Sequence, residues 1–196
     1  MFQVRIHGRG GQGVVTAAEI LAVAAFAEGR HAQAFPSFGS ERTGAPVVSY
    51  CRIDDAPIRT HEPVMAPDAL VVQDVTLVHQ VDLFAGLSHD GFVLINTSRK
   101  FSELGFEDHF RDFAEDRLLT CPATEIALEH VGRPLPNAAL LGGFAAFTGE
   151  ITLDAIQQAI VDRFEGVVGA RNAAAAKAAF EFVTRAKEEL SHASTN

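Results

Sequence analysis

The stretch FQVRIHGRGGQGV, residues 2–14, decides the fold. The apolar run Phe2–Ile6 predicts a strand, and the apolar segment 14–28 that follows the glycines predicts a helix. Glycine lets the backbone turn sharply and lets an anion approach it, and a helix start directs free N–H groups at that anion. The pattern therefore predicts a phosphate-bearing ligand, and the alternative is a tight turn that needs small residues only for packing. Three glycines have the G-x-G-x-x-G spacing in this strand–turn–helix context: Gly8, Gly10 and Gly13.

Strands and helices are expected to alternate along the rest of the chain. This order predicts an α/β fold with a doubly wound, mostly parallel sheet and helices on both faces, of the Rossmann-like kind. The glycine turn is expected at the carboxyl ends of the strands, where such sheets bind ligands. We expect one domain over residues 1–190 and a flexible tail over 191–196. Further strands are predicted at 31–35, 47–53, 69–73, 92–96 and 117–120, and further helices at 75–85, 106–113, 124–130, 138–147, 153–164 and 172–190.

The composition bounds the class of protein. With 16 Lys and Arg against 25 Asp and Glu, the net charge is −9, which argues against a general nucleic-acid surface. The chain opens without a basic and apolar leader, so no signal peptide is expected. The longest apolar stretch, Val14–Ala27, is too short to span a membrane, so we expect no membrane partner and a cytoplasmic location.

The sequence offers no self-sufficient active site. The two cysteines, Cys51 and Cys121, are too few for an iron–sulfur cluster or a zinc site and have no C-x-x-C neighbour. The eight histidines lack the H-x-x-x-H spacing of metal ligands. We therefore expect neither catalytic nor metal-binding residues. A phosphate-cradling loop without catalytic machinery indicates a subunit of a larger assembly.

Two further patterns narrow the ligand. A nicotinamide-binding fold usually has Asp or Glu at the end of its second strand, and residues 31–36 contain neither, which weakens the reading as a free-standing nucleotide-dependent oxidoreductase. No Gly-Lys-Ser/Thr follows the turn, so the Walker pattern is absent as well. The polar segment Pro36–Pro46 is either a surface loop or a loop that presents Ser40, Arg42 and Thr43 to a phosphate or a partner subunit.

Several segments together resemble one known family. The glycine segment 8–13, the helix start that follows it and the segment PSFGSERTGAP, residues 36–46, resemble the gamma subunit of 2-oxoacid:ferredoxin oxidoreductases. Weaker similarity continues through residues 68–72, 91–96 and 137–143. Thr43 departs from the pattern, because the family often has a second arginine there.

The resemblance implies a role in a hetero-oligomeric enzyme that oxidatively decarboxylates a 2-oxoacid to an acyl-CoA. This chain would contact coenzyme A and close the active site, and it would be inactive alone; a purely structural assembly subunit is the alternative. Thiamine diphosphate, Mg²⁺ and [4Fe-4S] clusters would belong to thiamine-binding alpha and beta subunits and a ferredoxin-like delta subunit, with a flavin subunit as a further partner. The 2-oxoacid and the final acceptor stay open. The implied coenzyme A contacts are Gly8, Arg9, Gly10, Gly11, Gln12, Gly13, Ser40, Arg42 and Thr43.

Overall fold

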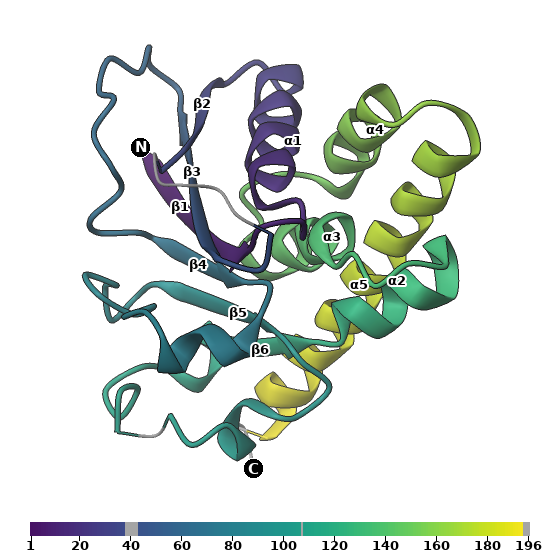
Figure 1. Ribbon diagram of the computed structural model, residues 1–196. Helices are drawn as coiled ribbons and strands as arrows, with labels where there is room; N and C mark the ends of the chain where they lie inside the picture. Colours follow the sequence, from purple (N-terminus) through teal and green to yellow (C-terminus); the bar gives the residue numbers. More distant parts are fainter. Residues whose placement is uncertain (38–42, 107, 194–196) are drawn as a thin grey trace.

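One mixed sheet of six strands forms the centre of the computed structural model, which describes residues 1–37, 43–106 and 108–193 (Figure 1). The strand order is β2-β3-β1-β4-β5-β6. β1, β4, β5 and β6 are parallel neighbours, and β3 runs antiparallel to both β1 and β2. The α/β fold with a mostly parallel sheet is therefore confirmed. The strands are β1 (Phe2–Arg9), β2 (His31–Pro36), β3 (Pro46–Asp54), β4 (Ala69–Val72), β5 (Phe92–Asn96) and β6 (Leu118–Cys121).

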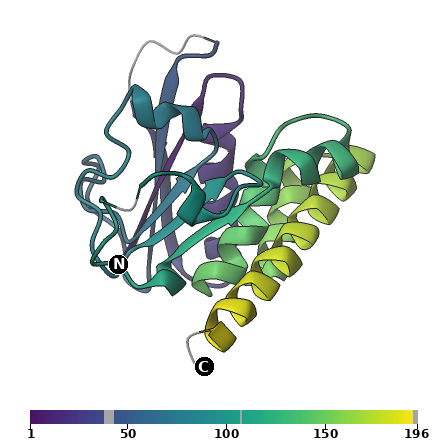
Figure 2. The same ribbon diagram turned by 90° about the horizontal axis from the view of Figure 1, so that it is seen from below.

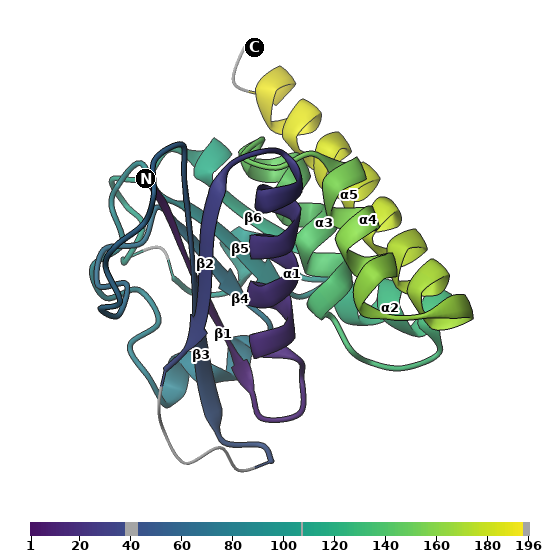
Figure 3. The same ribbon diagram turned by 90° about the horizontal axis from the view of Figure 1, so that it is seen from above.

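The α-helices gather on one face of this sheet (Figures 1 and 3). α1 lies over β2 and β3, and α3 lies over the middle of the sheet between α1 and α5. Buried alanines in α1 and α3 let each of these helices approach its neighbours closely. The helices are α1 (Val14–Ala27), α2 (Ala123–Val131), α3 (Asn137–Thr148), α4 (Leu153–Arg163) and α5 (Gly166–Ala193).

The second face differs from the expectation of α-helices on both sides. Where helices were predicted at 75–85 and 106–113, the described residues form the short 3₁₀ helix η1 (Val75–His79), turns and coil (Figure 2). β-Branched residues are frequent in segment 75–81, and they lower helix propensity. Phenylalanine rings packed edge to face fill the space instead, with Phe84 and Phe110 4.7 Å apart between ring centroids. The remaining short 3₁₀ helices are η2 (Phe101–Glu103) and η3 (Glu115–Arg117).

Two buried arginines attach coil to this second face. The Nη2 of Arg5 donates hydrogen bonds to the carbonyl oxygens of Leu83 and Ala85, at 2.8 and 2.7 Å. Arg52 donates to the carbonyl oxygen of Glu62 and, at 3.0 Å, to the side chain of Gln3. Buried carbonyls outside helices and strands need such donors, because an unpaired polar group inside a protein is costly. The guanidinium groups thus replace the contacts that a covering helix would make.

The ends of the last helices were predicted with mixed success. Thr152 was expected to cap α4, and its Oγ1 accepts a hydrogen bond from the Ala155 amide at 3.2 Å, which confirms the cap. α5 begins at Gly166, before the predicted start at residue 172. It also continues to Ala193, so residues 191–193 of the expected tail are helical, and 194–196 lie outside the described residues.

Replacing Gly142 by alanine should break the packing of α3 on α5. A Cβ at Gly142 would overlap the backbone carbonyl of Ala176, whereas a Cβ at the neighbouring Gly143 would meet the Val183 side chain at 3.2 Å. We expect Gly142→Ala to lower the free energy of unfolding by ~3 kcal/mol or more, and Gly143→Ala by ~1 kcal/mol or less. Denaturant unfolding of the two variants measures this difference. Equal losses would contradict the close helix approach.

His7 should make the fold sensitive to acid. Burial, together with the positive charge of Arg5, lowers the pKa of His7 to about 3. The group is neutral in the fold, and the unfolded chain binds its proton below pH ~6.5. Its contribution to stability is complete above that pH and declines by ~1.4 kcal/mol per pH unit as the pH falls toward 3. We expect His7→Leu to flatten the pH profile of unfolding in this window and the exposed His31→Leu to leave it unchanged. If the pH profiles of wild type and His7→Leu coincide, His7 is not a buried neutral imidazole in the folded protein.

Candidate anion-binding site

The glycine loop lies at the carboxyl end of β1, where the chain leaves the sheet and enters α1 (Figure 1). β1 lies between β3 and β4 in the sheet. After β1 the chain forms the antiparallel pair of β2 and β3 on one side of it, and then continues with the parallel strands β4, β5 and β6 on the other side. The point where successive strands change sides is the switch point at which α/β sheets bind ligands. The structure therefore places the loop where the sequence predicted it.

The glycines of the loop have different roles. A Cβ at Gly8 would lie 2.6 Å from a Val14 methyl carbon, and one at Gly13 would overlap the Asn137 side chain at the start of α3. These two positions require glycine for packing, which was the alternative reading of the motif. Gly11 has a φ of 96° and no atom within 4 Å of a Cβ, so its exposed backbone stands open to an incoming group.

The amino terminus of α1 is not capped by a side chain of the described residues. Gly13 is the N-cap, with a φ of 73°, and it has no side chain to accept from the first-turn amides. Within the described part of the chain, the first turn of α1 contains no acidic residue either. Uncapped amides and the positive end of the helix dipole make such a terminus favourable for an anion.

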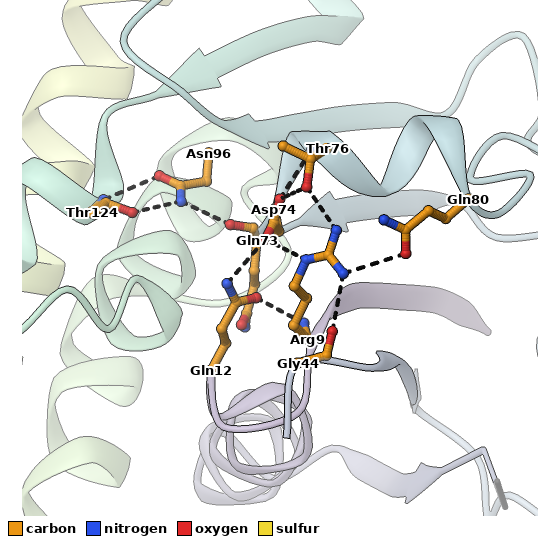
Figure 4. A network of polar contacts seen from close by, with 9 residues as sticks. All are labelled: Arg9, Gln12, Gly44, Gln73, Asp74, Thr76, Gln80, Asn96 and Thr124. Atoms are coloured by element: carbon orange, nitrogen blue, oxygen red, sulfur yellow. Dashed lines mark hydrogen bonds and ion pairs between the residues drawn. The ribbon is translucent and has the colours of Figure 1, made fainter. Parts of the chain in front are cut away.

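Arg9 ties the loop to its surroundings (Figure 4). Its guanidinium donates to the Asp74 carboxylate at 2.9 Å, the Thr76 hydroxyl at 2.8 Å and the Gly44 carbonyl at 3.0 Å. A longer contact of 3.3 Å reaches the Gln80 side chain. Four of the five N–H donors of an arginine are thus committed. This arrangement favours a positioning role for Arg9 over direct charge assistance to a ligand.

Asp74, which caps η1, is the acceptor at the centre of this network. It accepts from the Thr76 amide at 3.0 Å and from the Gln12 side chain at 3.3 Å, in addition to Arg9. Partial burial alone would raise the pKa of Asp74, but the hydrogen bonds from Thr76 and Arg9 and the charge of Arg9 lower it overall. Asp74 therefore stays ionised and keeps Arg9 in place.

Backbone contacts bring the two sequence motifs together. The Gly10 amide donates to the Ala45 carbonyl at 2.9 Å, and the Gly44 amide donates to the Gly10 carbonyl at 3.0 Å. Gly10 and the exposed Thr43 also form a parallel bridge. Thr43 is thus beside the glycine loop, whereas Ser40 and Arg42 lie outside the described residues.

Sequence reasoning missed an amide-rich group on the helix-covered side of the loop. The Asn96 side chain, at the end of β5, accepts from the Thr124 amide at 3.1 Å and donates to the Gln73 carbonyl at 2.8 Å (Figure 4). The Gln73 side chain is 1% exposed, and neither its Oε1 nor its Nε2 has a partner among the described residues. Asn137, at the start of α3, is buried against Gly13. The signal in the sequence was that the two central apolar runs, 69–73 and 92–96, each end in a polar residue, Gln73 and Asn96.

The remaining candidate groups show no reactive arrangement. Cys51 and Cys121 are buried, and burial raises the pKa of each thiol to about 12. Over residues 1–37, 43–106 and 108–193, His, Cys, Asp and Glu form no group of three or more that could hold a metal ion. No helix in that same part of the chain has the length and apolarity needed to cross a bilayer.

Comparison with known proteins gives consistent matches. The profile of the family described as pyruvate ferredoxin/flavodoxin oxidoreductase matches residues 3–182. The chain is 49% identical over 181 residues to the pyruvate synthase subunit PorC of Methanothermobacter marburgensis, covering 92% of this chain and 97% of the relative. It is 48% identical to the pyruvate/ketoisovalerate oxidoreductases common subunit gamma of Pyrococcus abyssi, covering 92% and 96%. The crystal structure of pyruvate oxidoreductase subunit PORC from Thermotoga maritima is similar, with a TM-score of 0.80, 37% identity and coverage of 92% and 95%.

Asp74→Asn should destabilise the fold through Arg9. The variant leaves the half-buried guanidinium without its counter-charge, so we expect a loss of ~1–3 kcal/mol in the free energy of unfolding at pH 7. Because the pKa of Asp74 is lowered in the fold, the wild-type advantage exists above its ordinary value and disappears as the pH falls through the folded value.

Asp55→Asn is the matched control, because Asp55 pairs with Arg30 at 3.1 Å but its side chain is 90% exposed. We expect a change within ~0.5 kcal/mol for this exposed pair. Unfolding curves at several pH values measure both variants. An Asp74 effect as small as the Asp55 effect, or one independent of pH, would contradict the network.

Proposed function

The chain belongs to the pyruvate ferredoxin/flavodoxin oxidoreductase family as a gamma-type subunit, and we propose that it contacts coenzyme A and closes the active site of the assembled enzyme. The complex would be a thiamine diphosphate-dependent hetero-oligomer that converts a 2-oxoacid and coenzyme A into an acyl-CoA and carbon dioxide. The two electrons released would pass to an external acceptor. The relatives are named as subunits of oxidoreductases, which supports an assembly of this kind.

The uncapped start of α1 is the observation that carries this proposal. The diphosphate of coenzyme A carries negative charge on oxygen atoms that accept hydrogen bonds, and the first-turn amides of α1 supply donors in a turn that contains no acidic residue. Gly11 gives the diphosphate access to the backbone, because no side chain covers it. Gly8, Gly10 and Gly13 then shape the loop, and Arg9 holds it through Asp74.

The segment that ends at Thr43 would complete the site. Its backbone attachment to Gly10 puts the beginning of β3 beside the glycine loop. Ser40, Arg42 and Thr43 are therefore proposed to face coenzyme A or the thiamine-bearing subunits. An arginine next to a diphosphate would add a charge-assisted hydrogen bond that the helix terminus alone does not provide.

The remaining cofactors are assigned to partner chains. Thiamine diphosphate, bound with Mg²⁺, would supply the decarboxylation chemistry, and [4Fe-4S] clusters would carry the electrons. Cys51 and Cys121 are buried thiols with raised pKa values, which is the opposite of what a cluster ligand needs. We therefore propose alpha and beta subunits for thiamine diphosphate and a ferredoxin-like delta subunit for the clusters, with a flavin subunit where the acceptor is NAD.

One alternative has specific support. Gly8 and Gly13 are required for packing against Val14 and Asn137, which is what a purely structural assembly subunit would also need. Its glycine loop would then bind nothing. A substitution at Gly11 distinguishes the two functions, because a Cβ built there would have no atom within 4 Å and would disturb no packing.

Gly11→Ala in the assembled enzyme tests coenzyme A binding. The added methyl group stands where the diphosphate would approach the backbone, so we expect the KM for coenzyme A to rise about tenfold, equivalent to ~1.4 kcal/mol of binding free energy. The kcat at saturating coenzyme A and the KM for the 2-oxoacid should change little. Steady-state kinetics with coenzyme A as the varied substrate gives these values.

Gly29→Ala provides the matched control. Gly29 has a φ of 81° and also has open space at its Cβ, but it follows the carboxyl end of α1. Both variants place an alanine at a positive φ, 96° at Gly11 and 81° at Gly29, so an effect that the two share would come from backbone strain. A coenzyme A KM that stays at the wild-type value in Gly11→Ala, in a correctly assembled complex, would support the structural alternative.

A further inference from the structure

The side chain of Gln12 occupies the inside of the glycine loop. Its Oε1 accepts a hydrogen bond from the Arg9 backbone amide at 2.8 Å, and its own backbone amide donates to the Arg9 carbonyl at 3.0 Å. An oxygen atom is therefore already bound to a backbone donor of this loop. That position is one that an oxygen of a bound phosphate would take in a glycine loop of this kind.

Gln12 is held there weakly. Beyond the Arg9 amide, its side chain makes one further hydrogen bond within the described part of the chain, from Nε2 to the Asp74 carboxylate at 3.3 Å (Figure 4). Asp74 already receives shorter hydrogen bonds from Arg9 and Thr76 and keeps them if Gln12 leaves. The hydrogen bond from an amide to a charged phosphate oxygen is stronger than the one to a neutral carboxamide. A phosphate can therefore replace Gln12 at the Arg9 amide.

The Gln73 carboxamide packs against Gly8 beside that of Gln12. A Cβ built on Gly8 would be 2.6 Å from a Val14 methyl carbon, 3.0 Å from the Gln12 Oε1 and 3.1 Å from the Gln73 Oε1, so Val14 and both carboxamides lie close to the same side of Gly8. Gln73 is 1% exposed, and its Oε1 and Nε2 are unpaired within the described part of the chain. A buried amide with two unpaired atoms is costly, and it gains most from a ligand that brings hydrogen-bonding atoms to it.

We propose that Gln12 is an internal stand-in for a phosphate oxygen. In the free subunit its side chain closes the loop and covers Gln73. When a diphosphate binds, Gln12 swings outward, a phosphate oxygen accepts from the Arg9 amide, and the Gln73 carboxamide, whose Oε1 lies nearest Gly8, turns over so that its Nε2 donates to the same anion. This inference rests on the proposed function, and it reverses the sign expected for Gln12, which becomes a competitor of the ligand instead of a contact.

Calorimetric titration of the assembled complex with coenzyme A, and separately with inorganic pyrophosphate, tests the inference. Gln12→Ala should bind both probes about three- to tenfold more tightly than wild type, because the ligand no longer has to displace the hydrogen bond between the Arg9 amide and the Gln12 side chain. Gln73→Met, similar in shape but without the amide, should bind both about three- to tenfold more weakly. The matched control Gln158→Ala removes an exposed glutamine of α4 and should change neither affinity.

The outcomes are separable. Weaker or unchanged binding by Gln12→Ala overturns the stand-in, and unchanged binding by Gln73→Met overturns its role as a donor. The proposed function is overturned as well if the wild-type complex turns over but neither coenzyme A nor pyrophosphate binds at this loop. Should Gln12→Ala fail to assemble, Gln12→Ser removes the same carboxamide and gives the same comparison. Thermal unfolding provides a further check, because Gln73→Met breaks no existing hydrogen bond and should not lower Tm.

Discussion

The close meeting of β1, α1 and α3 depends on the absence of side chains at Gly8 and Gly13. A Cβ at either position would collide with Val14 or with Asn137, so any other residue would push α1 or α3 away from the end of β1. Gly13, as the N-cap, also leaves the first-turn amides of α1 without a side-chain cap at the switch point of the sheet. A packing constraint and an anion-binding geometry thus arise from the same residues, because a close approach of helix and strand exposes backbone instead of side chains.

A second layer of contacts fixes this geometry. Arg9 and Asp74 join the end of β1 to η1, and the Gly10 backbone joins the loop to the segment that leads into β3. Residues separated by more than 30 positions in sequence therefore share one short edge. A binding loop held in this way needs little reordering when a ligand arrives, which preserves affinity. In the proposed exchange, the loop backbone stays in place, the Gln12 side chain turns outward and the Gln73 carboxamide turns over.

Much of the fold follows from sequence, because the strands are short apolar runs with clear ends and α1 follows its glycine turn directly. The described residues of segments 75–85 and 106–113 do not form the predicted α-helices, since their apolar residues are held by aromatic contacts and by Arg5 across long sequence distances. The glycine loop was identified from its spacing, but the partners of Arg9 were not. Asp74 and Thr76 lie 65 and 67 residues further along the chain, and the pairing of β4 beside β1 brings them to the loop.

A structure of the complete enzyme with coenzyme A bound would show where the diphosphate lies. We expect density for the diphosphate against the amides at the start of α1, next to Gly11, with the Gln12 side chain turned away from the Arg9 amide. A diphosphate bound entirely by other subunits, with Gln12 still hydrogen-bonded inside the loop, would contradict this expectation.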